Sequence, residues 1–125
     1  MDGYDPAHAP DAEEWLELDE GERALLVREY HHRARVTLPS PEAHAMIHAV
    51  VETQIAAGDP PAARAALERL LAAGLDRHDA IHAVGAALMT HVHAALQAER
   101  PAGDPSVAYV EELEGLTAEG WRRGH

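Results

Sequence analysis

The sequence predicts an all-α protein, a compact bundle of about five antiparallel helices joined by short loops. Apolar residues make up 46% of the 125 residues, but aromatic residues only 4%, and Phe is absent. Ala, Leu and Val must therefore fill the core, which is typical of helix packing. No segment alternates between apolar and polar residues over the length of a strand. Pro and Gly recur where helices would begin and end.

The N-terminal part is expected to hold a tail and two helices. Residues 1–10 are acidic and contain two prolines, which predicts a flexible tail ahead of a single helical domain of residues 11–125. A first short helix is expected in DAEEWLEL, anchored by Trp15. Asp19 precedes Glu22 by three residues, the spacing of a capping box, so a second helix should run from there to about Ala34.

Further helix starts are indicated by capping residues and prolines. Ser40 is a good N-cap with Pro41 at the first helical position, and this helix should end near Ala57 because Gly58 follows it. The same kinds of signal place the remaining starts at Asp59-Pro60, Asp76-Arg77, Asp104-Pro105 and Thr117. Short connections favour antiparallel neighbours, so the helices that start at Pro41 and Arg77 should run parallel, with one helix between them.

One pair of histidines occurs twice. HAMIHAV begins at His44 and HDAIHAV at His78, which gives the shared frame H-x-x-I-H-A-V. Residues four apart on a helix share a face, so each pair can bind one divalent ion, and two pairs at the same end of a bundle can form a four-nitrogen site. The candidate metal ligands are therefore His44, His48, His78 and His82.

Two further residues extend this candidate site. Glu52 continues the row of His44 and His48, but it lies about 12 Å along the helix from His44. It is therefore interpreted either as a ligand of a second ion or as an acceptor for an imidazole N–H. His31, at the end of the helix that returns to the same end of the bundle, is the remaining candidate ligand.

Composition narrows the cofactor and the partners. Cys is absent, which excludes thiolate ligands and leaves zinc, iron, manganese, nickel and copper open, with zinc or iron favoured. A net charge of −12 without a basic stripe argues against nucleic acid and anionic membranes. No apolar run approaches the roughly 18 residues of a membrane span. The first residues do not look like a signal peptide, so the protein is predicted to be cytoplasmic.

Several stretches together resemble a family of small bacterial helical proteins of unknown function. They are AHAMIHAVVETQIA, GLDRHDAIHAVGAAL and LTAEGWRR, and the resemblance covers most of the chain from about Leu18. It implies a helical fold and draws attention to the same six positions: His31, His44, His48, Glu52, His78 and His82. This chain has Thr53 where the family pattern has asparagine, which leaves the role of that position in doubt.

The leading hypothesis is a helical protein with a histidine-rich divalent metal site, of unknown activity. If the ion keeps an open position, the protein could be a metal-dependent hydrolase or oxidase with a small-molecule substrate, but the sequence does not decide whether it is an enzyme. One alternative is a non-catalytic interaction module, such as a homodimer, in which the histidines are structural. The other is a metal storage or delivery protein.

Overall fold

The computed structural model describes residues 3–33, 41–97 and 105–124, and these ranges contain seven α-helices and no strand. The all-α prediction is confirmed, with five helices of eleven or more residues and two short ones, α1 and α7. The helices are α1 (Ala12–Glu17), α2 (Glu20–Arg33), α3 (Pro41–Ala57), α4 (Pro61–Ala72), α5 (Arg77–Gln97), α6 (Pro105–Gly115) and α7 (Ala118–Gly124).

Three of the six predicted N-caps are confirmed, at Asp19, Asp76 and Thr117, whereas Ser40 and Asp104 lie outside the described residues. The N–H of Glu22 donates to the Asp19 carboxylate (2.8 Å), and the Asp19 N–H donates back to the Glu22 side chain (3.4 Å), so the capping box is confirmed. The Asp76 carboxylate likewise accepts a backbone N–H at the start of α5. Helix α4 begins one residue later than predicted, because Pro60 is its N-cap and Pro61 its first helical residue.

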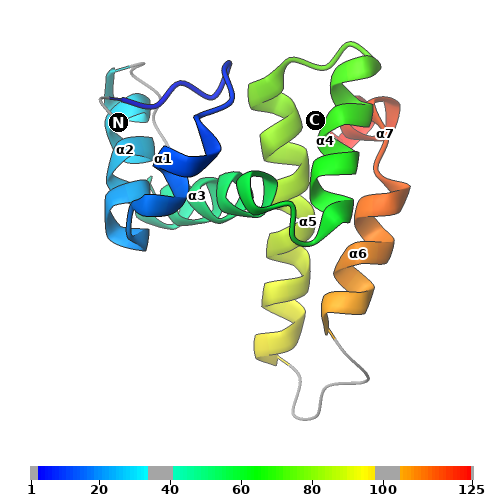
Figure 1. The fold of residues 1–125 in the computed structure, drawn as a ribbon. Helices are drawn as coiled ribbons and strands as arrows, with labels where there is room; N and C mark the ends of the chain where they lie inside the picture. Colours follow the sequence, from blue (N-terminus) through cyan, green and yellow to red (C-terminus); the bar gives the residue numbers. More distant parts are fainter. Residues whose placement is uncertain (1–2, 34–40, 98–104, 125) are drawn as a thin grey trace.

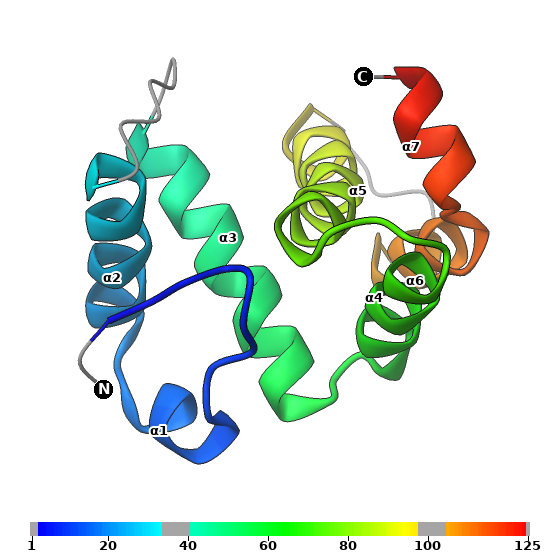
Figure 2. The same ribbon diagram turned by 90° about the horizontal axis from the view of Figure 1, so that it is seen from above.

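The helices form two arrangements that share α3. Helices α4, α5 and α6 lie side by side and alternate in direction, whereas α3 lies across α5 (Figures 1 and 2). The prediction that α3 and α5 run parallel was therefore wrong. The physical reason is that α3 packs against α1 and α2 as well as against α4 and α5, so it bridges two groups of helices instead of joining one.

Two apolar clusters reflect this division. The N-terminal cluster consists of the buried residues Tyr4, Trp15, Val27, Ala45 and Ala49. The C-terminal cluster is larger and draws on α4, α5, α6 and α7. Helix α3 contributes to both, since Val51 belongs to the C-terminal cluster.

A glycine sets the approach of α3 and α5. A Cβ atom at Gly85 would lie 3.1 Å from the Cγ2 atom of Ile47 and 3.7 Å from that of Val51. The first distance is tighter than an ordinary carbon–carbon contact. The missing side chain of Gly85 therefore lets the two helices cross closely at this point.

The segment before α1 packs against the helices. Tyr4 and Pro6 are buried, and the segment crosses over α3 towards the start of α5 (Figure 2). A flexible tail was expected through Pro10, whereas the structure places these two side chains in the interior. This packing places an aromatic hydroxyl between α3 and α5.

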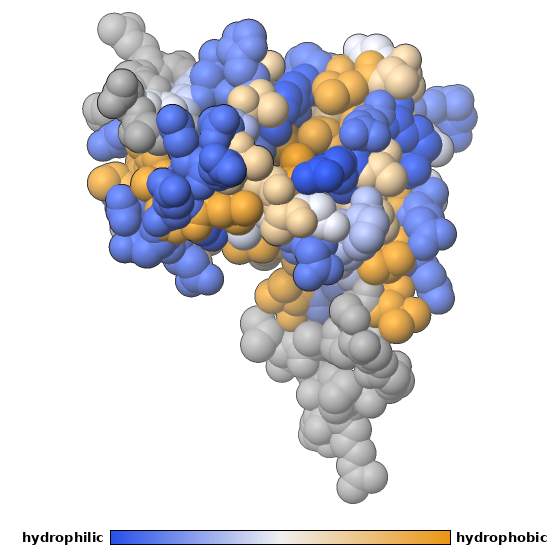
Figure 3. All heavy atoms as spheres, in the orientation of Figure 1, coloured by the Kyte–Doolittle hydropathy of each residue, from blue (hydrophilic) through white to orange (hydrophobic). Residues whose placement is uncertain are grey.

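One face of the molecule mixes polar and apolar side chains. On the face drawn in Figure 3, hydrophilic side chains alternate with apolar groups. Within the described ranges, no helix combines the length and the apolar character that crossing a bilayer requires.

Candidate metal centre

Four histidines meet where α3 crosses α5. The ring centroids of His78 and His82 are 4.3 Å apart, and those of His44 and His82 are 4.9 Å apart. The His48 ring lies 5.2 Å from the rings of both His78 and His82. The two HxxxH pairs therefore contact each other across the helix crossing, and each of the four predicted ligands belongs to the group.

Three of these histidines present nitrogen atoms at a suitable separation for one ion. One ring nitrogen from each of His44, His48 and His82 lies within 4.8 Å of the other two. Two nitrogens bound to the same zinc ion lie about 3.3 Å apart, given zinc–nitrogen bonds of about 2.0–2.1 Å. Side-chain adjustments that total about 1.5 Å for a pair of nitrogens would close that difference. The Nε2 atoms of all four histidines are buried.

The helix crossing explains why the pairs meet. The i, i+4 spacing puts each pair on one face of its helix, and Gly85, three residues after His82, allows α3 to approach that face. Parallel helices are not needed, because crossed helices bring two short stretches together at their point of contact.

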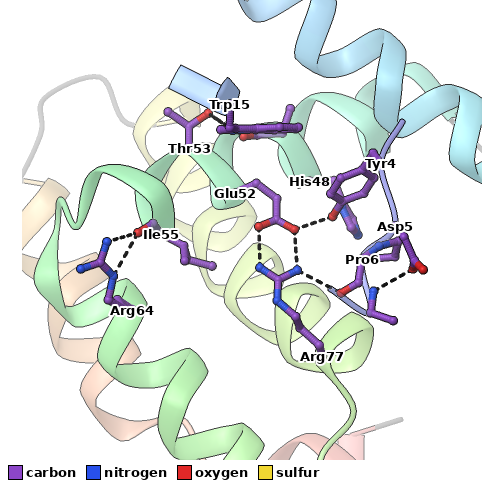
Figure 4. A network of polar contacts seen from close by, with 12 residues as sticks. Tyr4, Asp5, Pro6, Trp15, His48, Glu52, Thr53, Ile55, Arg64 and Arg77 are labelled. Atoms are coloured by element: carbon purple, nitrogen blue, oxygen red, sulfur yellow. Dashed lines mark hydrogen bonds and ion pairs between the residues drawn. The ribbon is translucent and has the colours of Figure 1, made fainter. Parts of the chain in front are cut away.

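Glu52 is not a member of this nitrogen group. Its carboxylate is 1% exposed and accepts two hydrogen bonds of 2.7 Å from the guanidinium of Arg77 (Figure 4). Burial alone would lower the pKa of Arg77, but the hydrogen bonds and charge of Glu52 outweigh it, so that the pKa is raised. Of the two roles open for Glu52, the structure favours supporting the histidines over binding an ion.

Tyr4 connects this ion pair to the histidines. Its hydroxyl donates to Oε2 of Glu52 (2.6 Å) and lies 2.8 Å from Nδ1 of His48 (Figure 4). Burial, and then the nearby Glu52 charge, raise the pKa of Tyr4 far above its ordinary value, so the phenol keeps its proton. The carboxylate thus acts on His48 through a tyrosine.

The last turn of α2 borders the group, as the topology predicted. The Tyr30 ring lies 5.7 Å from that of His78 and 6.1 Å from that of Tyr4. His31 follows Tyr30 in α2, but its side chain lies outside the part of the chain that the structure describes, so its role as a ligand stays a prediction.

Two neighbours of Glu52 have other partners. The Thr53 hydroxyl accepts hydrogen bonds from the Trp15 indole and from Arg23, both at 3.1 Å, and so joins α3 to α1 and α2. Gln54 accepts a hydrogen bond of 2.7 Å from the Tyr109 hydroxyl of α6. Thr53 therefore connects α3 to α1 and α2, and Gln54 connects α3 to α6. Neither residue contacts the histidine group through these bonds.

A surface pocket borders the histidine group at His82. It has a volume of about 580 Å³, and His82 is part of its wall. Asp76, Asp79, Trp121 and Arg122 also line it, so the wall carries both signs of charge and one aromatic side chain. A small polar molecule could approach His82 by this route.

Sequence reasoning missed Tyr4, Arg77 and Gly85. A lone aromatic residue in the acidic first segment was the available signal for Tyr4, and an arginine directly before His78 was the signal for Arg77. The chain matches no family model, no curated protein and no solved structure. The resemblance to small bacterial helical proteins therefore stays a prediction.

Proposed function

We propose that the protein binds one divalent transition-metal ion through His44, His48 and His82, with zinc or iron as the ion. The observation that carries the proposal is the convergence of three ring nitrogens within 4.8 Å at the crossing of two helices. His78 is the candidate fourth ligand, because its ring adjoins that of His82 and its Nε2 atom is buried with the others.

The imidazole nitrogens favour a transition-metal ion over magnesium or calcium. Imidazole nitrogen suits zinc, iron, copper and nickel, whereas magnesium and calcium prefer oxygen ligands. The Glu52 carboxylate is bound to Arg77 and Tyr4. A single divalent ion can accept the lone pairs of several neutral imidazoles at once, which matches this arrangement.

We extend the proposal to a small-molecule function. If His78 does not coordinate, an ion held by three histidines keeps a coordination position for water, as in catalytic zinc sites, and the pocket that His82 lines lies beside this group. A metal-dependent hydrolase or oxidase is the activity that this arrangement would support. Reversible binding without turnover would instead assign the protein to metal storage or delivery.

The test measures metal content and affinity in the full chain without a histidine tag. We expect about one equivalent of zinc or iron in the wild type and its loss in the double variant His48→Ala/His82→Ala. His91→Ala is the matched control, because His91 also lies on α5 but pairs with Glu112 of α6, and it should bind as the wild type does. His78→Ala shows whether a fourth nitrogen contributes to affinity.

Failure to bind zinc or iron in the wild type, even after reloading, would overturn the proposal. The histidines would then be packing residues, and the non-catalytic interaction module would become the better hypothesis. Equal loss of binding in the His91 control and in the double variant would mean that the change reflects general destabilisation of the fold.

A further inference from the structure

Tyr4 sits between a buried carboxylate and a candidate metal ligand. Its hydroxyl oxygen is 2.6 Å from Oε2 of Glu52 and 2.8 Å from Nδ1 of His48. Both are ordinary hydrogen-bond lengths. All three side chains are at most 2% exposed, so water does not compete strongly for these contacts.

The hydrogen atoms shared by Glu52, Tyr4 and His48 can be counted. The Glu52 carboxylate pairs with the Arg77 guanidinium, so it is ionised and can only accept. Tyr4 has a single O–H, and that hydrogen points to Glu52. The Tyr4 oxygen must then accept at its lone pairs, which requires His48 to carry a hydrogen on Nδ1.

We infer that Tyr4 is a positioning residue that fixes the tautomer of His48, with its proton on Nδ1 and its lone pair on Nε2. The inference rests on the proposed metal site, because the lone pair on Nε2 is what an ion would bind. A metal-bound histidine commonly donates its other ring N–H to a neighbouring acceptor, which orients the ring and raises its basicity. Here the acceptor is a tyrosine that is polarised by a carboxylate.

The position of Tyr4 is held by several independent contacts. Arg77 donates to the Pro6 carbonyl oxygen (2.9 Å) with the same Nη1 atom that binds Glu52. The Tyr4 ring also packs against Trp15, with centroids 5.7 Å apart, and edge-on against His48 at 5.6 Å. One arginine therefore anchors both the carboxylate and the backbone that carries the tyrosine (Figure 4).

The test compares Tyr4→Phe with the wild type in two measurements. Competition with a chromophoric chelator should show zinc binding about 10- to 100-fold weaker in the variant, the usual effect of removing such an acceptor. Imidazole nitrogen NMR of the metal-free protein should show His48 protonated on Nδ1 in the wild type and shifted towards the Nε2–H form in the variant. Tyr109→Phe is the matched control, because it removes another buried tyrosine hydroxyl, one that bonds Gln54.

The two measurements separate the possible failures. A wild-type His48 protonated on Nε2 would overturn the inference without any variant. Weaker zinc binding with an unchanged tautomer, or equal weakening in Tyr109→Phe, would also overturn it, because the role of Tyr4 would then be structural. If the wild type binds no metal but the tautomer responds to Tyr4→Phe, the positioning role stands and the proposed metal function fails.

Discussion

The two apolar clusters on either side of α3 are stabilised in different ways. The C-terminal cluster buries large aliphatic side chains such as Leu70, Ile81 and Leu113 with essentially no exposure. Arg69 donates to the carbonyl oxygens of Leu113 and Leu116 at the edge of this cluster, and the buried Tyr109 hydroxyl donates to Gln54. That half of the molecule is therefore held mainly by buried apolar area.

The N-terminal cluster contains fewer aliphatic side chains and more directed polar contacts. Trp15 and Arg23 both donate to the Thr53 hydroxyl, and Tyr4 donates to Glu52. Buried hydrogen bonds require exact partners, and removing one partner leaves the other costly to bury. The N-terminal half therefore depends on a few specific polar pairs, whereas the C-terminal half depends mainly on packing.

The largest effect is expected from breaking the buried ion pair. In Arg77→Met the Glu52 carboxylate loses its cation in a buried site, and the free energy of unfolding should fall by about 3–5 kcal/mol. Urea unfolding followed by circular dichroism measures it. The double variant Glu52→Leu/Arg77→Met should recover much of the loss, because no buried charge is left unpaired. No recovery would mean that Arg77 contributes mainly by other contacts.

A packing defect in the C-terminal cluster should act differently. Leu70→Ala removes a fully buried side chain, so the free energy of unfolding should fall by about 2–5 kcal/mol. Zinc affinity of the folded protein should stay close to the wild-type value, since Leu70 belongs to the cluster away from Tyr4 and His48. Calorimetric zinc titration of the folded variant checks this, and a parallel loss of affinity would show that the two clusters are coupled.

A smaller effect should appear at high pH. Burial, with a lesser contribution from Glu112, raises the pKa of Tyr109 to about 12, although its hydrogen bond with Gln54 acts in the opposite direction. The neutral phenol is favoured in the fold, so this stabilisation is present below pH 10 and is lost as the pH rises through 12.

Urea unfolding at several pH values between 9 and 12 measures this loss. The wild type should lose about 2 kcal/mol more than Tyr109→Phe across this range. Using the difference between the two proteins removes the contribution of Tyr4, which both retain. Curves of the same shape for both proteins would show that Tyr109 titrates as an exposed tyrosine does.

Local features of the fold and the site were predictable from the sequence. The capping box at Asp19 and the cap at Asp76 depend on residues three apart, and the two HxxxH faces depend on residues four apart. All the residues that make up such a signal lie within about one turn of a helix. They therefore identify helix starts and candidate ligands without knowledge of the tertiary structure.

The residues that position the histidines were not predictable in the same way. Tyr4 contacts His48 and Glu52, which follow it in the sequence by 44 and 48 positions. Arg77 contacts the carbonyl oxygen of Pro6, which precedes it by 71 positions. These pairings depend on the path of the first segment over α3, for which no local pattern exists. The crossing of α3 and α5 depends on the absence of a side chain at Gly85. Sequence analysis that looks for ligand or catalytic side chains does not single out such a glycine.

Helix α3 also differs from its neighbours in how much sequence change it can tolerate. Among positions 44–57, only Met46, Val50 and Ala57 are exposed, because one side of the helix faces α1 and α2 and the other faces α4 and α5. Most substitutions in α3 would thus disturb a packed or hydrogen-bonded side chain. A library of random variants should accept few changes there, and inherited variation would concentrate on the outward faces of α2 and α4.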